Sequence, residues 1–173
     1  MSLSSDSNTI NALGIFGRLT PELEAYFHSL EEKYSMRPES DPANGIFNHL
    51  SLVIKNDVPV GNIPKYLDCL RALRPYLPVR LKTNGVIIKE DKHVALSFDT
   101  KQTETIRGVA LSFIPGGVVT TFYTKVVWFV PKENLEKVMQ EVANINELVF
   151  YDFFLVANRQ NDENMIYSSN RYQ

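Results

Sequence analysis

The sequence has few of the residue types that disulfide scaffolds and metal sites need. Its 173 residues include one cysteine, one tryptophan and three histidines. A single cysteine excludes a disulfide within the chain, and we interpret Cys69 as a small buried residue of an apolar helix. The scattered histidines have no metal-ligand spacing, and Gly116-Gly117 is too short for a phosphate-binding loop. We therefore expect neither a metal nor another cofactor.

Long apolar runs and a strong charge of one sign are also missing. No segment approaches the roughly 18–20 apolar residues of a membrane span, and the first nine residues lack the apolar core of a signal peptide. The net charge of -2 gives no general attraction for nucleic acid, so long duplex DNA is not an expected partner. We expect a monomer in the reducing cytoplasm, without membrane contact.

What remains is an ordinary globular composition, with 44% hydrophobic and 22% charged residues. The length suits one domain with a full core. We assign residues 1–8, which are rich in serine, to a disordered lead-in and residues 9–173 to a single domain.

Hydrophobic periodicity and turn residues divide the domain into strands and helices. Thr20, Pro21 and Glu24 mark the start of a helix, whose apolar stripe continues to Tyr34. A loop follows at 37–45. Strands are predicted at 10–16, 47–54, 79–83, 86–89, 93–99, 118–130 and 148–157, and further helices at 63–74 and 134–145. Residues 109–113 are ambiguous, because 103–112 fits a short helix running into a strand equally well.

Strand–helix–strand units recur at both ends of this pattern, and hairpin-like links join several strands. We therefore predict an α+β fold of two pseudo-symmetric, antiparallel-rich lobes around a central cleft. Strands 47–54 and 120–130 are expected to be central, one on each side.

The sharpest candidate for chemistry is His49-Leu50-Ser51-Leu52. On a strand, residues two apart face the same side, so the imidazole and the hydroxyl emerge together while both leucines anchor the other face. An imidazole exchanges protons near neutral pH, and a hydroxyl can donate a hydrogen bond to a phosphoryl oxygen. By itself the motif is short enough to occur by chance.

With this motif, the sequence resembles the 2H phosphoesterases, which include bacterial 2′-5′ RNA ligase-like proteins and cyclic phosphodiesterases. That family carries two His-x-Thr/Ser motifs, one in each of two pseudo-symmetric lobes. The resemblance extends over residues 10–172 and is mostly hydrophobic patterning outside the first motif. It implies that His49 is an acid/base group, that Ser51 binds phosphate, and that the ligand is a phosphorylated small molecule, nucleotide or RNA end.

The second motif departs from the family pattern. Lys125 stands 76 residues after His49, where the second histidine is expected, and Val127 stands where its Thr or Ser is expected. A lysine with a reference pKa near 10.4 stays protonated at neutral pH, and valine donates no hydrogen bond. The loss implies weakened catalysis, with Lys125 as a compensating cation. Anion binding would survive such a loss more readily than turnover.

Other candidates are weaker. Arg80 and Lys82 share a strand face and could line a phosphate site, although a solvated face explains them as well. Tyr123 shares a face with Lys125 and could stack on a base. His93 begins a rival motif that lies too close to His49 in sequence, and we expect a partly exposed histidine at a strand start. His28 is expected at the surface of its helix.

Two kinds of function fit these residues. One is a phosphodiesterase acting on 2′,3′-cyclic or 2′-5′-linked nucleotide ends. The other is a binding module that holds such a ligand without turnover, with a fold retained only for protein partners as a further alternative.

Overall fold

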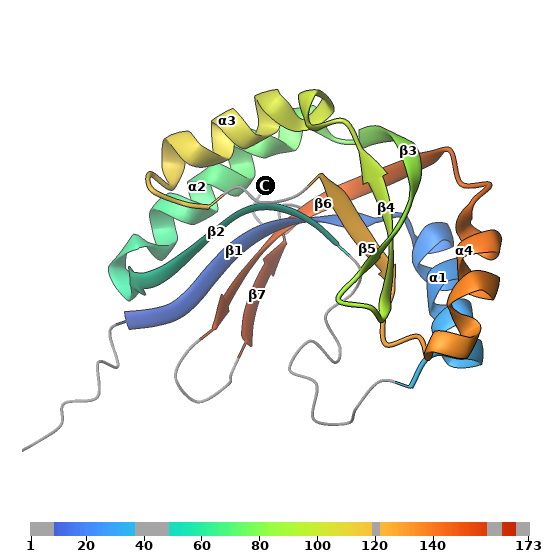
Figure 1. Ribbon diagram of the computed structural model, residues 1–173. Coiled ribbons are helices and arrows are strands. Elements are labelled where there is room, and N and C mark those ends of the chain that lie inside the picture. Colours follow the sequence, from blue (N-terminus) through green and yellow to red (C-terminus); the bar gives the residue numbers. More distant parts are fainter. Residues whose placement is uncertain (1–8, 37–48, 119–121, 159–163, 169–173) are drawn as a thin grey trace, which may run out of the picture.

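The computed structural model describes residues 9–36, 49–118, 122–158 and 164–168 (Figure 1). The expected lead-in 1–8 and the loop at 37–45 lie outside these ranges. The strands are β1 (Thr9–Leu19), β2 (His49–Pro59), β3 (Val79–Lys89), β4 (His93–Phe98), β5 (Tyr123–Val127), β6 (Glu147–Asn158) and β7 (Asn164–Ser168). The α-helices are α1 (Pro21–Tyr34), α2 (Ile63–Leu73), α3 (Glu104–Phe113) and α4 (Leu135–Val142).

The order of these elements is a repeat: β1-α1-β2-α2-β3 is followed by β4-α3-β5-α4-β6. Within the described residues the strands form one seven-stranded sheet in the order β2-β1-β6-β3-β4-β5, with β7 paired to β6, and every named pair is antiparallel. The order is symmetric under exchange of the two halves, which matches β2 with β5, β1 with β4 and β6 with β3. The predicted α+β fold of two pseudo-symmetric lobes is confirmed.

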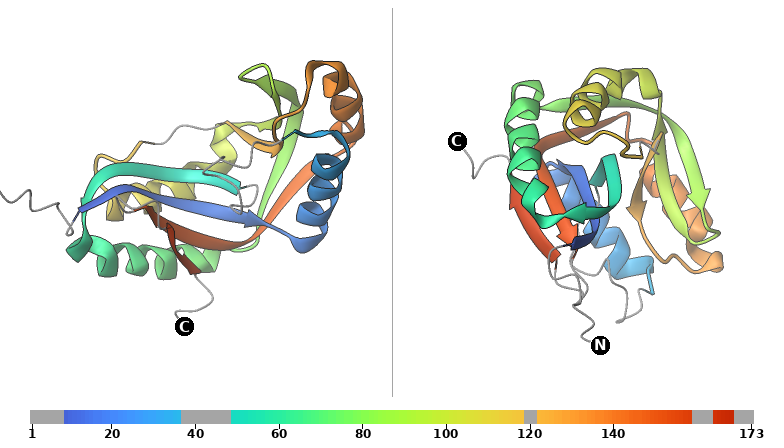
Figure 2. Two further views of the ribbon diagram at one scale, coloured as in Figure 1. Left: turned by 90° about the horizontal axis from the view of Figure 1, so that it is seen from below. Right: turned by 90° about the vertical axis from the view of Figure 1, so that its left-hand side faces the viewer.

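Helices cover the sheet in two pairs. In Figures 1 and 2, α2 and α3 lie together over the β1–β2 side, whereas α1 and α4 lie together beside β4 and β5. The two outermost strands, β2 and β5, contact each other. Val118 also pairs with Ile54 of β2 just before β5 begins, with N–O distances of 2.7 and 3.0 Å. The curled sheet therefore brings its two edges together.

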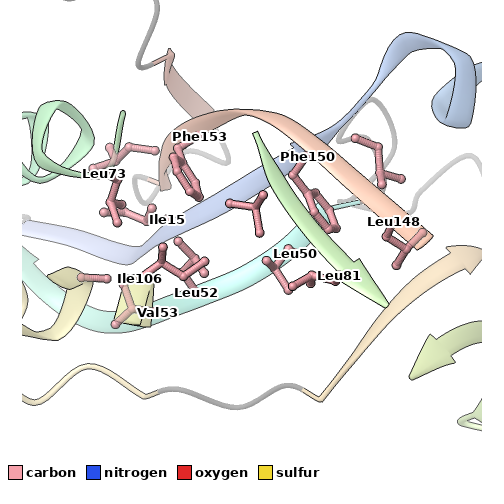
Figure 3. Close-up of a cluster of buried hydrophobic side chains, with 14 of the residues drawn as sticks. Ile15, Leu50, Leu52, Val53, Leu73, Leu81, Ile106, Leu148, Phe150 and Phe153 are labelled. Carbon is pink, nitrogen blue, oxygen red and sulfur yellow. The ribbon is translucent and has the colours of Figure 1, made fainter. Parts of the chain in front are cut away.

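The core under α2 and α3 explains why β2 holds its orientation. Leu50 and Leu52 are fully buried, as expected for the anchoring face of the strand. Figure 3 shows them among apolar side chains from the sheet and both helices, including Ile15, Leu73 and Phe153. Full burial of each such side chain stabilises the fold by about 1.5–3 kcal/mol. Turning β2 over would expose both leucines, so the core fixes which side His49 occupies.

The predicted helix boundaries agree closely with the structure. α1 begins at Pro21 as expected, although the Thr20 side chain makes no capping hydrogen bond. Its first turn is tied to the sheet by Glu24, which accepts a hydrogen bond from Arg18 Nε at 3.1 Å. The segment 103–112 is helical, because Ile106 and Ala110, four residues apart, give α3 one buried stripe.

Two strand predictions were wrong in extent and position. β5 ends at Val127 rather than at residue 130, while residues 119–121 of the predicted strand lie outside the described ranges. β2 and β5 are the outermost strands of the sheet, not central ones. β5 ends early because the next backbone groups leave the ladder. Trp128 N–H donates to Glu31 Oε1 at 3.0 Å, and Phe129, with a φ of 52°, donates its N–H to His93 Nδ1 at 3.1 Å.

Candidate functional site

His49 and Ser51 lie at the start of β2, on the face away from the leucine core. His49 pairs with Arg18 and Ser51 with Phe16 across β1, and both are half-buried. The His49 ring meets the Phe16 ring edge-on, with 4.5 Å between centroids, and Phe154 lies at 6.5 Å. The predicted alternation of side chains is correct for this pair, and aromatic packing holds the imidazole in place.

The alternation breaks directly after Ser51. Between the pairs Phe16–Ser51 and Ile15–Val53, β1 advances by one residue and β2 by two, so Leu52 is the extra residue of a β-bulge. Continued alternation along β2 would place Val53 on the face of His49. It instead pairs with Ile15 and is buried with it in the core, as Figure 3 shows. The face of β2 that carries the side chains of His49 and Ser51 therefore ends at Ser51.

Lys125 lies on β5 opposite Ala95 and takes part in a compact polar cluster. Its Nζ lies 3.4 Å from Glu90 Oε2, at the tip of the β3–β4 hairpin, and 4.6 Å from the centroid of the Trp128 ring. The lysine side chain is only 17% exposed, so this neighbourhood constrains it. The nearby ammonium group lowers the pKa of the Glu90 carboxyl below its usual value.

His93 was expected to be partly exposed, and this is wrong: the residue is 2% exposed. Its Nε2 lies 2.8 Å from Glu90 Oε2, and its Nδ1 accepts the Phe129 N–H. Nδ1 is therefore unprotonated, and Nε2 carries the proton that Glu90 accepts. Burial lowers the pKa of His93, and the positive charge of Lys125 lowers it further. With both nitrogens engaged, His93 holds Glu90 in place.

Val127 does not share the face of Lys125, contrary to the expectation from strand alternation. Between the pairs Ala95–Lys125 and Val94–Val127, β4 advances by one residue and β5 by two. Val127 therefore shares the face of Val94, and both are fully buried. A hydroxyl at this position would point into the core.

The remaining candidates occupy different surroundings. Tyr123 is half-buried on the face of Lys125, with Lys89 Nζ 4.7 Å from its ring centroid. Arg80 and Lys82 are exposed on β3, and Arg80 pairs with Glu147 on β6 at 2.9 Å. Their roles as ligand contacts stay predictions. His28 is exposed and lies 3.1 Å from Glu32 on the same helix.

Several features lie away from these residues. Cys69 is buried, as expected, and burial raises the pKa of its thiol to about 12. Among the described residues no group of three or more His, Cys, Asp or Glu could hold a metal ion. None of the helices in those same ranges is long and apolar enough to cross a membrane. A polar groove of about 520 Å³ lies between α1 and α4; it is lined by Tyr26, Tyr34, Lys137, Gln140, Glu141, Asn144 and Ile145.

No sequence-family profile and no curated protein sequence matches the chain. Solved structures do match. The crystal structure of E. coli LigT complexed with phosphate is similar to 94% of this chain over 95% of its own, with 14% identity and a TM-score of 0.56. LigT complexed with 3′-AMP gives the same coverage, 13% identity and a TM-score of 0.54. A crystal structure of a phosphoesterase gives 13% identity, coverage of 92% and 95%, and a TM-score of 0.55.

These likenesses span 92–94% of the chain and show its fold, which is that of a 2H phosphoesterase. Its architecture is similar to that of LigT.

Sequence reasoning missed Glu90 and the aromatic neighbours of His49. Glu90 sits in a hairpin, where a carboxylate is unremarkable in sequence, and its contact with Lys125 spans 35 residues. Phe16 reaches His49 only because β1 and β2 pair in one register.

Proposed function

We propose that this protein binds 2′,3′-cyclic or 2′-5′-linked nucleotide ends through His49 and Ser51, and that its hydrolysis of them is weak. The observation that supports this most is the placement of His49 and Ser51 on one face of β2, next to β5, in a fold like that of LigT. LigT itself has been crystallised with phosphate and with 3′-AMP.

The two side chains supply complementary chemistry. When a 2′,3′-cyclic phosphate is hydrolysed, a water oxygen bonds to phosphorus and one ester P–O bond breaks. His49 would take the proton of the attacking water, because an imidazole titrates near neutral pH. The Ser51 hydroxyl would donate a hydrogen bond to a non-bridging phosphoryl oxygen.

The departing ribose oxygen also needs a proton, and this requirement limits the rate. Members of the family supply it from a second histidine, whereas here Lys125 stands at the expected interval. A lysine is a poor acid at neutral pH, although its charge can stabilise the phosphoryl group. Losing one member of an acid–base pair costs on the order of 10²–10⁴ in rate. We therefore expect binding of the nucleotide to be retained while its hydrolysis is slowed.

A panel of 2′,3′-cyclic nucleotides followed by phosphorus NMR tests both activities in one sample. We expect saturable binding with slow conversion to the monophosphate, and loss of conversion in His49→Ala. His28→Ala is the matched control, because His28 is exposed on α1. Equal activity in wild type and His49→Ala would contradict the proposal.

A second candidate, a module that binds without turnover, is favoured by one observation. The residue two positions after Lys125 is Val127, which is buried and has no hydroxyl. It therefore donates no hydrogen bond to a phosphoryl oxygen. Saturable binding with no conversion by any variant would select this candidate. Absence of both binding and conversion would favour a fold retained for protein partners.

A further inference from the structure

The two outermost strands are equivalent positions of the internal repeat. β2 and β5 each follow the first helix of their half and end the sheet at opposite sides of its order. Their first five residues have the same burial pattern: half-buried, buried, half-buried, buried, buried. The pattern runs from His49 to Val53 in β2 and from Tyr123 to Val127 in β5.

The β-bulges fall at the same point of this pattern. In β2 the extra residue comes directly after Ser51, and in β5 it comes directly after Lys125. In both strands the residue beyond the bulge, Val53 or Val127, turns into the core. A bulge re-aims every side chain that follows it, so matched bulges are a stricter guide to equivalence than sequence spacing.

From this match we propose that Tyr123 and Lys125 are the second half of the ligand site, with Tyr123 in the place that His49 has in the first half and Lys125 in the place of Ser51. The inference rests on the proposed function and revises it at one point. The equivalent of His49 is a tyrosine, and the lysine takes the position of the phosphate-binding hydroxyl.

The chemistry of the two side chains suits these places. Tyr123 and Lys125 face the same side of β5, because their partners Ser97 and Ala95 are two residues apart on β4. The phenol oxygen of Tyr123 carries a hydrogen that it can donate in a hydrogen bond. Lys125 donates to a phosphoryl oxygen as a charged substitute for a hydroxyl. A singly charged phosphodiester that accepts hydrogen bonds from Ser51, Tyr123 and Lys125, with His49 as the base beside it, is the ligand class that this arrangement fits.

The first test separates the hydroxyl of Tyr123 from its ring. Tyr123→Phe removes only the oxygen, and we expect about 10- to 100-fold weaker binding of 2′,3′-cyclic AMP, the usual effect of deleting a hydrogen bond to a charged group. Tyr76→Phe, at an exposed tyrosine outside the site, should bind as wild type does. Unchanged binding in Tyr123→Phe would overturn the proposal. It would mean that the hydroxyl donates no hydrogen bond to the ligand and that the ring alone contributes, for example by stacking.

The second test compares two ways of restoring a second His-x-Thr motif. Tyr123→His with Lys125→Thr places both new side chains before the bulge, and we expect hydrolysis of the cyclic nucleotide to rise by about 10²–10⁴ over wild type. Lys125→His with Val127→Thr places the hydroxyl in the core and should bring no gain. A gain in the second variant alone, or in neither, overturns the proposal. Circular dichroism shows whether each variant is folded.

Failure of the proposed function gives a different result. If wild type binds no cyclic nucleotide and His49→Ala changes nothing, both ideas are refuted. If wild type binds, His49→Ala does not, and Tyr123→Phe is unchanged, only the role of Tyr123 is refuted.

Discussion

Val127 lies directly opposite Val94, with both side chains fully buried, although Lys125 two residues earlier lies opposite Ala95 on the other face of the sheet. One extra residue in β5 produces this change. Simple alternation would have placed Lys125 and Val127 side by side.

Val127→Thr is therefore a test of the core. The hydroxyl would be buried against apolar neighbours, and we expect the free energy of unfolding to fall by about 1–3 kcal/mol. Urea denaturation followed by circular dichroism measures the change. Val118→Thr is the matched control, because Val118 is 56% exposed and should change stability by no more than about 0.5 kcal/mol. Equal stabilities of the two variants would mean that Val127 is not on the Val94 face.

Glu90 neutralises part of the charge of Lys125, and its removal should strengthen anion binding. Glu90→Gln leaves a side chain of similar shape without a charge, so the bound phosphate no longer meets a nearby carboxylate. We expect about 3- to 10-fold tighter binding of 2′,3′-cyclic AMP at low salt by calorimetry.

The control for this variant is Asp91→Asn. It makes the same change of charge at the next hairpin residue, where the backbone has a similar φ of 58°. Asp91 is exposed and forms no ion pair with any residue in the described part of the chain. An equal gain in both variants would show a general effect of net charge, and no gain in Glu90→Gln would mean that the ligand does not approach Lys125.

Local patterns were sufficient to predict much of the fold. The start of α1 was readable from Pro21 and the acidic first turn, and the burial of Leu50 and Leu52 followed from alternation in a half-buried strand. These features depend on residues within one or two turns of each other. The antiparallel two-lobed architecture followed from the recurrence of such units.

The incorrect predictions for Val53, Val127 and His93 have one physical source. The position of each side chain depends on contacts with residues that are distant in sequence. The bulges that bury Val53 and Val127 are set by pairing with β1 and β4. The burial of His93 follows from Trp128 and Phe129, whose rings lie 4.8 Å from its own. No pattern within β2, β4 or β5 alone contains these contacts.

Thr124 carries a buried hydroxyl for which the described part of the chain provides no hydrogen-bond partner. Thr124→Val should therefore stabilise the fold, by about 1 kcal/mol, since it removes an unsatisfied polar group and keeps the shape. Thr103→Val is the opposite case, because the buried Thr103 hydroxyl donates to the Thr100 carbonyl at 3.0 Å. We expect it to lose about 1 kcal/mol in the same denaturation assay. Destabilisation by Thr124→Val would show that its hydroxyl has a partner.

His93 should make the folded state less stable as the pH falls below about 6.5. Burial and the charge of Lys125 lower its pKa in the folded state, whereas in the unfolded chain it takes up a proton near pH 6.5. Its contribution is therefore complete above pH 6.5 and is lost as the pH falls toward the lower, folded-state pKa. The Glu90 carboxyl, whose pKa is also lowered, acts in the same direction only below about pH 4.5, which is a lower pH range than that of His93.

We expect the melting temperature of wild type to fall from pH 7.5 to pH 5. The melting temperature of His93→Gln should be lower at neutral pH and should fall less over the same range. His28→Gln, at an exposed histidine, should follow wild type. A slope in His93→Gln as steep as that of wild type would assign the pH dependence to another group.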